Sequence, residues 1–262
     1  MILDLKNKNA VICGSTQGIG KATAIEIALL GANVTLVARN EDALKKTILE
    51  LDTAKGQKHN YICADFSNPD DLKQKIEKHI AAGSVVHILV NNTGGPKGGP
   101  IINAKPEEFT QTFSNHLICN HILVQAVVQG MKKEKYGRII NIISTSVKQP
   151  LKGLGVSNTI RGAVANWSKT LSMELAQFGI TVNNVLPGMT NTGRIRDLIS
   201  AKAKAASKTE VEIEKEMMNE IPAGRLAEAN EIANAVAFLA TPAAAYINGT
   251  NVTVDGGRTG SW

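Results

Sequence analysis

The fold is decided by residues 9–20, which read Asn9-Ala10-Val11-Ile12-Cys13-Gly14-Ser15-Thr16-Gln17-Gly18-Ile19-Gly20. An apolar run typical of a buried strand, Ala10–Cys13, leads into three glycines spaced G-x-x-x-G-x-G, and a helical pattern over Gly20–Leu30 follows. In such a unit the glycines permit a tight turn, the approach of backbone to a pyrophosphate, and close packing of helix on strand. The amino terminus of the helix adds free N–H groups and a partial positive charge. This context predicts a dinucleotide-binding loop over Cys13–Gly20.

The rest of the chain repeats this alternation of short apolar runs and helical patterns. The predicted strands are Ala10–Cys13, Asn33–Val37, Tyr61–Cys63, Ile88–Val90, Arg138–Ile143, Thr181–Leu186 and Asn251–Val254. The predicted helices are Gly20–Leu30, Glu41–Thr53, Pro69–Ala82, Lys105–Lys133, Val156–Phe178 and Ala229–Ala240. Nearly continuous apolar strands are expected in a parallel sheet that is covered on both faces. We therefore predict one α/β domain over residues 1–262, a Rossmann-type doubly wound parallel sheet of about seven strands with helices on both faces.

Proline and glycine mark several of the predicted helix ends. Asn68-Pro69 and Lys105-Pro106 are typical of a helix start, where proline suits the first turn. Gly31, Gly137 and Gly179 each follow a predicted helix end, where a positive φ angle is expected.

One segment interrupts the alternation. Residues 190–220 lie between the strand that ends at Leu186 and the helix that begins at Ala229, and they include a charged helical pattern near Lys208–Glu220. An excursion of this size is usually a lid or binding loop, with a mobile surface insertion as the alternative. We predict a substrate-lid insertion within the domain. Arg194 and Arg196 near its start suit contact with an anionic substrate or carrier phosphate, or simple solvation.

Composition excludes several other classes of protein. With 43% hydrophobic and 20% charged residues the chain has the balance of a soluble globular domain, and no apolar run approaches the ~20 residues of a membrane span. The N-terminal residues lack a secretory pattern, and three widely spaced cysteines suit reduced thiols without a metal site, so a cytoplasmic location is expected. A net charge of +6 favours anionic ligands, while 4% aromatic residues argue against nucleic-acid binding.

Further motifs appear in the order of a known family. Asn91-Asn92-Thr93-Gly94 resembles the N-N-A-G of short-chain dehydrogenases/reductases, Asp65-Phe66 resembles their adenine contact, and Pro187-Gly188 resembles their turn beside the nicotinamide. The segment from Ile221 to Arg258 is also similar, most of all to the 3-oxoacyl-[acyl-carrier-protein] reductase branch. The resemblance covers essentially the whole chain. It implies an oxidoreductase that binds a nicotinamide dinucleotide and forms a homotetramer or homodimer, in part through the tail that ends at Trp262.

The loop and the resemblance together indicate the cofactor-binding residues. They are Gly14, Ser15, Thr16, Gln17, Gly18, Ile19, Gly20, Arg39, Asp65, Phe66, Asn92, Gly94, Pro187, Gly188, Met189 and Thr190. Arg39 occupies the end of the second strand, where a carboxylate would bind the ribose hydroxyls of NAD(H). A guanidinium there matches a 2′-phosphate, so NADP(H) is preferred over NAD(H). An ordinary surface arginine is the alternative, and Gln17 is neutral where NADP-dependent relatives often carry a basic residue.

The catalytic positions depart from the family pattern, which has a serine, a tyrosine four residues before a lysine, and an asparagine on the preceding helix. No Y-x-x-x-K is present in the sequence. Counting back from the matching segment Trp167–Leu171 places Ser157 at the tyrosine position and Arg161 at the lysine position. Ser144 retains the family serine, and His116 stands where the family has asparagine.

These replacements lead to a catalytic hypothesis. Ser157 and Arg161 share a helix face, but a serine hydroxyl is shorter and less acidic than a phenol, and arginine stays charged. Among the four residues only His116 has an ordinary pKa, about 6.5, that suits proton exchange at neutral pH. We therefore expect Ser144 and Ser157 to bind a carbonyl, Arg161 to orient the ribose, and His116 to supply the proton directly or through water. In the alternative, His116, Ser157 and Ser144 have structural roles alone.

Two functions fit this pattern. The first is an NADP(H)-dependent oxidoreductase that acts on a small-molecule carbonyl or on an acyl-carrier- or CoA-linked one, such as a ketone or a 3-oxoacyl thioester. The second is an NADP(H)-binding paralogue with little catalysis that acts as a sensor or assembly partner. The cofactor elements and the lid favour the enzyme, whereas the missing tyrosine and lysine favour the paralogue. Neither nucleic acid nor a membrane is an expected partner.

Overall fold

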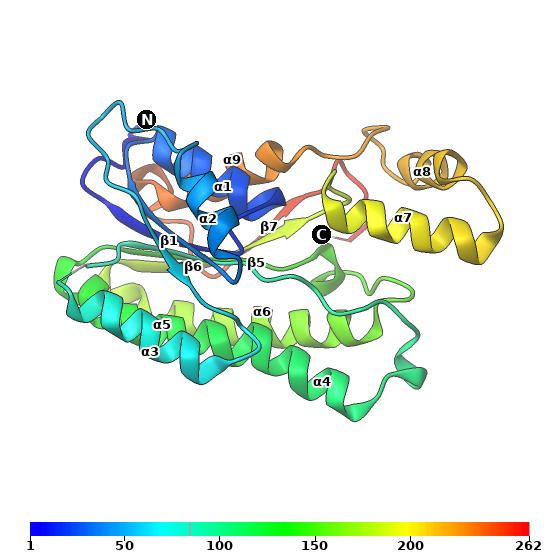
Figure 1. Cartoon of the computed structure of the whole chain (residues 1–262), viewed down its shortest axis with the longest axis horizontal. Coiled ribbons are helices and arrows are strands. Elements are labelled where there is room, and N and C mark those ends of the chain that lie inside the picture. The colour runs from blue at the N-terminus through cyan, green and yellow to red at the C-terminus, as the bar shows by residue number, and fades with distance from the viewer. Residues whose placement is uncertain (84, 262) are drawn as a thin grey trace.

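The computed structural model describes residues 1–83 and 85–261, and it is built on a seven-stranded sheet of order β3-β2-β1-β4-β5-β6-β7. The strands are β1 (Asn9–Cys13), β2 (Asn33–Ala38), β3 (Asn60–Cys63), β4 (Ile88–Asn91), β5 (Gly137–Ile142), β6 (Ile180–Pro187) and β7 (Asn251–Val254). Every neighbouring pair is parallel, so the predicted doubly wound Rossmann-type fold is confirmed (Figure 1). Strand order reverses between β1 and β4, and their carboxyl ends open a crevice of the kind that binds ligands.

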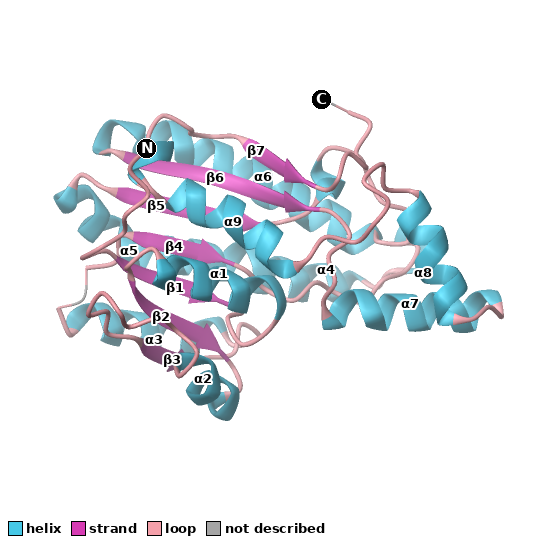
Figure 2. Cartoon of the chain, turned by 90° about the horizontal axis from the view of Figure 1, so that it is seen from above, coloured by secondary structure: helices cyan, strands magenta, loops and turns pink. Residues whose placement is uncertain are grey.

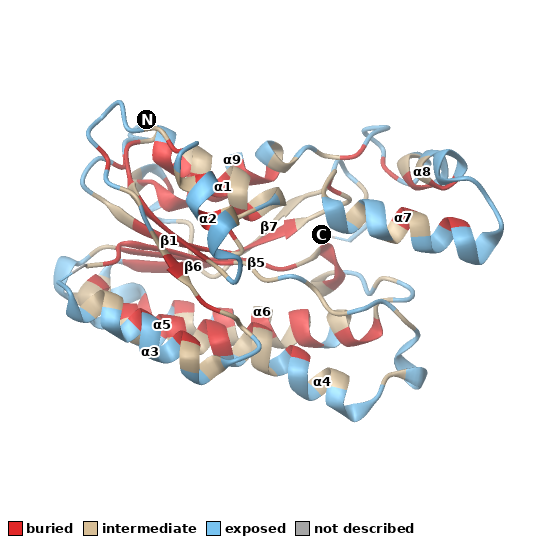
Figure 3. Ribbon diagram, viewed as in Figure 1, coloured by how far each residue is buried: buried red, intermediate tan, exposed pale blue. Residues whose placement is uncertain are grey.

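Helices cover both faces of the sheet (Figures 1 and 3). On one face lie α1 (Gly18–Leu29), α2 (Glu41–Ile48) and α9 (Ala229–Ala240), and on the other lie α3 (Pro69–Ala81), α4 (Pro106–Phe113), α5 (Cys119–Glu134) and α6 (Gly155–Leu175). Short 3₁₀ turns occur at Ile101–Asn103, Thr145–Val147, Ala176–Phe178 and Pro242–Ala244. Every residue of β5 is buried, because helices cover it on both sides. This double cover explains why the strands are almost continuous apolar runs in the sequence. Trp262, at the end of the predicted interface tail, lies outside the described residues.

The predicted helix Lys105–Lys133 is divided in the structure. A π-helical turn, Ser114–Ile118, separates α4 from α5, and His116 lies at its centre. A π turn adds one residue to a helical turn, so it shifts the helix face that follows, and it occurs frequently at functional sites. The expectation of one regular helix is wrong here because a single-residue insertion hardly changes the spacing of apolar residues.

Two other helix ends differ from the prediction. α2 ends at Ile48 instead of Thr53, because the chain continues in tight turns with hydrogen bonds to carbonyls three residues back. The positive φ expected after helices is present at Gly31 (102°) and Gly179 (73°), but not at Gly137, where the expectation is wrong. Lys135 takes the left-handed conformation there, with φ of 52°. Gly137 already belongs to β5, and a Cβ on it would lie 2.8 Å from side-chain atoms of its neighbours.

Residues 190–220 form two helices that project beyond the carboxyl edge of the sheet (Figure 2). These are α7 (Gly193–Ala206) and α8 (Glu210–Asn219). They pack on each other through a small apolar cluster made by Ile199, Ala203, Ile213 and Met217. In the part of the chain that the structure describes, no helix combines the length and the apolar character needed to cross a membrane.

A row of asparagine side chains crosses the carboxyl half of the sheet. Asn91 donates to Asn141 (2.8 Å), Asn141 donates to Asn184 (3.0 Å), and Asn184 donates to Asn251 (2.8 Å). The four residues are also direct register partners across β4, β5, β6 and β7. Asparagine suits such a row, because its side-chain amide donates one hydrogen bond and accepts another. This amide ladder fixes the relative register of the strand ends.

We predict that Asn141→Ala lowers the free energy of unfolding by about 3 kcal/mol, because it leaves buried amide groups of two neighbours unpaired and opens a cavity. Urea unfolding followed by circular dichroism measures the effect. The exposed Asn219 serves as the matched control, and Asn219→Ala is expected to change stability by no more than about 0.5 kcal/mol. Equal stabilities for the two variants would contradict the ladder's role.

Candidate active site

The glycines of the first loop bring backbone segments into close approach. Gly14 and Gly18 have φ angles of 59° and 53°, in the left-handed region that favours glycine. A Cβ on Gly20 would lie 2.1 Å from the carbonyl oxygen of Gly14, so only glycine lets the loop fold back on the start of α1. The N-cap residue of α1, Gln17, makes no side-chain capping bond, so the first N–H groups of the helix stay available. This cradle fits the phosphates of a dinucleotide.

The cradle is held by residues on the neighbouring strands. Asn92, just after β4, donates to the carbonyls of Cys13 (3.2 Å) and Gly14 (3.4 Å) and so joins the loop to the next strand end. Ser15 is buried and donates to Val37 of β2 at 3.4 Å. Ile19 packs against the core, while Thr16 is half-buried and Gln17 is exposed.

Arg39 and Asp65 lie at the carboxyl ends of the next two strands. Arg39 is exposed directly after β2. The residue at this position is thus an arginine and not an aspartate or glutamate. The pKa of Asp65 is lowered mainly by the backbone N–H of Ser67, and the positive charge of Arg39 lowers it further. Phe66 packs its ring against the core between sheet and helices, so its side chain is occupied by packing.

The predicted residues after β4 and β6 lie on the opposite side of the crevice. Gly188 passes so close to β7 that a Cβ would lie 2.6 Å from the Cα of Asp255, and its N–H donates to Val254. The backbone of Met189 accepts from Ala227, and Thr190 is buried. Pro187 ends β6, whereas Gly94 is exposed with open space around it.

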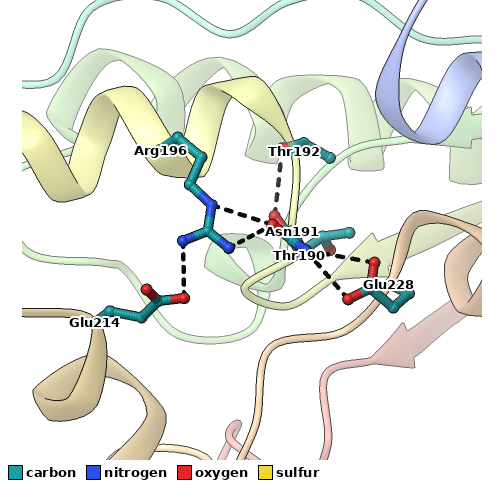
Figure 4. Close-up of polar contacts among 6 residues, drawn as sticks. All are labelled: Thr190, Asn191, Thr192, Arg196, Glu214 and Glu228. Atoms are coloured by element: carbon teal, nitrogen blue, oxygen red, sulfur yellow. Dashed lines mark hydrogen bonds and ion pairs between the residues drawn. The ribbon is translucent and has the colours of Figure 1, made fainter. Parts of the chain in front are cut away.

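Thr192 is a candidate that sequence reasoning missed. A Cβ on Gly18 would lie 3.2 Å from its methyl group, so this residue of the lid reaches the cradle. Its hydroxyl donates to the carbonyl of Thr190 at 3.3 Å (Figure 4). The available signal was a threonine directly before a helical pattern, in the N-cap position of α7.

The base of the lid is tied to the domain by a polar network (Figure 4). Arg196 donates to Asn191 (3.2 and 2.8 Å) and forms an ion pair with Glu214 of α8 at 2.9 Å. Asn191 in turn donates to Glu228 at 3.1 Å, and its backbone pairs with Ala227 at 2.7 Å. Arg196 therefore has a structural role in holding the lid.

Ser144, Ser157 and Arg161 come from the end of β5 and the first turns of α6. Arg161 is buried, and it donates to the carbonyls of Ile142 (2.9 Å) and Thr93 (3.3 Å). Burial first, and then the charge of Arg194, lower its pKa to about 10, so it remains a cation at neutral pH. The hydroxyl of Ser144 accepts from the N–H of Ser146. Ser157 is half-buried, one helical turn before Arg161.

His116 differs from its sequence-based expectation in protonation state. The side chain is buried in the π turn, and Nδ1 is hydrogen-bonded to the hydroxyl of Thr93. Burial, with the charges of Arg161 and Arg194 as further causes, lowers the pKa of His116 to about 2. The expectation of a freely titrating histidine is therefore wrong. The ring is neutral at physiological pH, with one nitrogen as donor and the other as acceptor.

His116 and Arg161 are linked at the carboxyl edge of the sheet, with Ser144 after β5 and Ser157 one helical turn before Arg161. Thr93 links the groups, since its hydroxyl bonds His116 and its carbonyl accepts from Arg161. The site offers hydroxyl groups, a fixed positive charge and a neutral imidazole. Such a set can bind and polarise a carbonyl oxygen, but it holds no group that is acidic near neutral pH.

We predict that His116→Asn reduces the loss of stability in acid. The ordinary pKa of 6.5 applies in the unfolded chain, so between pH 6.5 and about 2 the unfolded state binds a proton here that the folded state does not. This residue therefore lowers the free energy of unfolding by about 1.4 kcal/mol per pH unit as the pH falls below 6.5, and by about 2 kcal/mol at pH 5.

Urea unfolding at pH 7.5 and at pH 5 measures the difference. The histidine is neutral in both states at the higher pH, so the comparison at pH 7.5 isolates the packing cost of the substitution. An unchanged pH dependence in the asparagine variant would show that His116 titrates normally in the folded protein.

Comparison with known proteins finds relatives that match almost the whole chain. Residues 14–259 match the family model described as enoyl-(acyl carrier protein) reductase. The 3-oxoacyl-[acyl-carrier-protein] reductase FabG of Vibrio cholerae is 33% identical over 258 residues, which cover 97% of this chain and 98% of the relative. The enzyme of the same name from Escherichia coli is 33% identical over 255 residues, with the same coverage of 97% and 98%.

Solved structures agree with this result. L-sorbose reductase from Gluconobacter frateurii, in complex with NADPH and L-sorbose, superposes with a TM-score of 0.93 at 29% identity and 100% coverage of both chains. YwfH, an NADPH-dependent reductase involved in bacilysin biosynthesis, superposes with a TM-score of 0.91 at 28% identity, covering 97% of this chain and 99% of that one. The chain therefore belongs to the short-chain dehydrogenase/reductase family of oxidoreductases.

Proposed function

We propose that this protein is an NADP(H)-dependent reductase that converts a carbonyl to a hydroxyl group with a rearranged proton-donating site. The observation that carries the proposal is the meeting of two features at one sheet edge. One is the glycine cradle at the end of β1, which fits a dinucleotide. The other is the cluster of Ser144, Ser157 and Arg161 beyond β5, two strands away. A hydride carrier bound on the first would reach the second.

The cofactor would be held by the residues of the cradle and the neighbouring strand ends. Free N–H groups at the start of α1 would bind the pyrophosphate, and Arg39 would bind the 2′-phosphate. Asp65, Asn92 and the turn at Pro187–Thr190 would line the remaining length. When bound, NADPH supplies a hydride from its nicotinamide ring. Two structural relatives are described with NADPH, which supports this choice over NADH.

Ser144, Ser157 and Arg161 would act on the substrate oxygen. The two hydroxyls would donate hydrogen bonds to the carbonyl, and the guanidinium would stabilise negative charge that develops on the oxygen. Arg161 is well suited to this because two bonds to backbone carbonyls hold it in place before the substrate arrives. A fixed dipole or charge in a buried site can lower the activation barrier by about 3 kcal/mol per donor. The same guanidinium would orient the ribose.

His116 would take part in proton delivery as a neutral ring. With a pKa of about 2 it carries a single N–H proton at neutral pH and no second, acidic one, so it would have to receive a proton from water as it gives its own up. The hydroxyl of Thr93, which is hydrogen-bonded to His116, provides a second group for such a relay. We therefore propose that solvent is the proton source and that His116 and Thr93 conduct the proton.

The substrate would be a ketone or an acyl-carrier- or CoA-linked carbonyl, as the names of the relatives suggest. α7 and α8 would act as its lid. Phe113, Ile118 and Met173 are large apolar residues that stay exposed on α4, the π turn and α6, and they suit an interface in a homodimer or homotetramer. Three free cysteines fit a cytoplasmic location. The competing function, cofactor binding without catalysis, is favoured by the absence of an acidic proton donor.

We predict that Arg39→Gln weakens NADPH binding about tenfold or more and leaves NADH binding within about twofold, because only NADPH carries the phosphate that the guanidinium would bind. Fluorescence titration with each cofactor measures the dissociation constants. Lys58→Gln is the charge-matched control, because Lys58 is exposed before β3 at the opposite edge of the sheet. An equal effect of Arg39→Gln on both cofactors would argue for a general electrostatic role.

Turnover tests the function itself. We expect stopped-flow mixing with NADPH and a panel of ketones, diketones and 3-oxoacyl thioesters to show oxidation of NADPH with at least one substrate class. The rate should lack an ionisation of His116 near pH 6.5, because the ring stays neutral. Tight NADPH binding without turnover of any of these compounds would support the non-catalytic paralogue instead.

A further inference from the structure

Two guanidinium groups from different elements hold the loop that follows β4. Arg161 of α6 donates to the carbonyl of Thr93 at 3.3 Å, and Arg194 of α7 donates to the carbonyls of Gly95 and Pro96, both at 2.9 Å. A Cβ on Gly95 would lie 2.8 Å from a nitrogen of Arg194, so the loop approaches this arginine closely. Two positive charges therefore lie at the two ends of one short stretch, residues 93–96.

Neither charge is neutralised by the protein. Within residues 1–83 and 85–261, no carboxylate lies within ion-pair distance of Arg161 or Arg194, although Asp197 on α7 is near enough to raise the pKa of Arg194. Other arginines around the lid are paired, as in Arg196–Glu214, Arg225–Glu231 and Arg258–Glu220. The charge of Arg194 lowers the pKa of Arg161, so the two cations repel each other. Holding them together is unfavourable unless an anion completes the site.

The phosphates of the cofactor lie elsewhere in the proposed arrangement. They would bind at the cradle between β1 and α1 and at Arg39 after β2. Arg161 instead bonds the chain after β4 and the last residue of β5, on the other side of β1 in the strand order. A different anion is therefore required for this pair.

The free donors of the pair define what that anion is. A guanidinium has five N–H donors in one plane, and each of these two uses a pair of them on backbone carbonyls. The remaining planar donors match the two oxygens of a carboxylate. Arg161 is one helical turn, about 6 Å, from Ser157, which is proposed to bind the carbonyl, so the two substrate groups must be close together.

We infer that the substrate is a short oxo acid whose carboxylate, attached to the reacting carbonyl or one carbon away from it, binds between Arg161 and Arg194. This inference rests on the proposed reductase function and specifies its substrate class. Arg161 is buried and fixed, so it sets the position of the carboxylate. Arg194 is exposed on the lid, so it completes the site from the solvent side.

A binding experiment tests this without requiring turnover. Isothermal titration of the NADP⁺ complex with oxamate, a carboxylate analogue of a 2-oxo acid, is compared with oxamide, its neutral counterpart. We expect oxamate to bind at least about tenfold more tightly than oxamide. Arg194→Gln should weaken oxamate binding about tenfold and leave oxamide binding and NADPH affinity unchanged. Lys202→Gln, which removes an exposed positive charge of α7 without changing the polar network at the base, should alter oxamate binding by no more than about twofold.

The outcomes separate the two proposals. A protein that binds NADPH but binds oxamate no better than oxamide overturns the oxo-acid inference and leaves the reductase intact. Equal losses in the Arg194 and Lys202 variants also overturn it, because they would indicate a nonspecific effect of lid charge. A loss of NADPH affinity in Arg194→Gln would assign this arginine to the cofactor instead. A wild-type protein that fails to bind NADPH overturns both proposals.

Discussion

The candidate site residues that follow β4, β5 and β6 are placed by the ends of these strands, and the amide ladder links the three strands to one another and to β7. Asn91 lies one residue before Asn92 and two before Thr93, and Asn141 lies three residues before Ser144. Since side chains alternate along a strand, a register slip of one residue would turn each of these groups to the opposite face of the sheet. Four amides that bond in sequence, three of them buried and Asn251 half-buried, resist such a slip, because a shifted register would leave them unpaired. By fixing the strand register, the ladder also fixes where the residues that follow these strands lie in the site.

Arg161 has consequences that a lysine in the same place would not have. A buried ammonium can lose its proton when it is desolvated, but a guanidinium stays charged. Here it is anchored to the chain after β4 and β5 as a permanent cation, and its charge helps to keep His116 neutral. A site of this kind stabilises negative charge on a substrate instead of supplying a proton from an acidic side chain. If Ser157 and Arg161 stand at the family's tyrosine and lysine positions, as the resemblance implies, the two replacements are parts of one electrostatic arrangement.

The sequence was sufficient to predict the sheet, because parallel strands buried on both faces leave continuous apolar runs, and each of the seven lies within one residue of its expected bounds. The glycine cradle was also predictable, since a positive φ at Gly14 and a close approach at Gly20 admit no other residue. The π turn around His116 was not predictable, because it preserves the apolar spacing of a regular helix. The pKa of His116 could not be read from the sequence either, since it depends on burial and on Arg161 and Arg194, which are distant along the chain.

The base of the lid carries both its anchors to the domain and its contact with the site loop. Its base is held by the backbone pairing of Asn191 with Ala227 and by the ion pair of Arg196 with Glu214, while its contact with the site loop consists of the two bonds from Arg194 to neutral carbonyls. A carboxylate adds the attraction of opposite charges to the hydrogen bonds that it accepts from a guanidinium, and it can accept two of them in parallel. An anionic ligand on the remaining donors of Arg194 would therefore add to the contacts that hold the start of α7 at the site, and its binding would be coupled to the position of α7. Arg194 would then both select a negatively charged substrate and couple the binding of that substrate to the position of the lid.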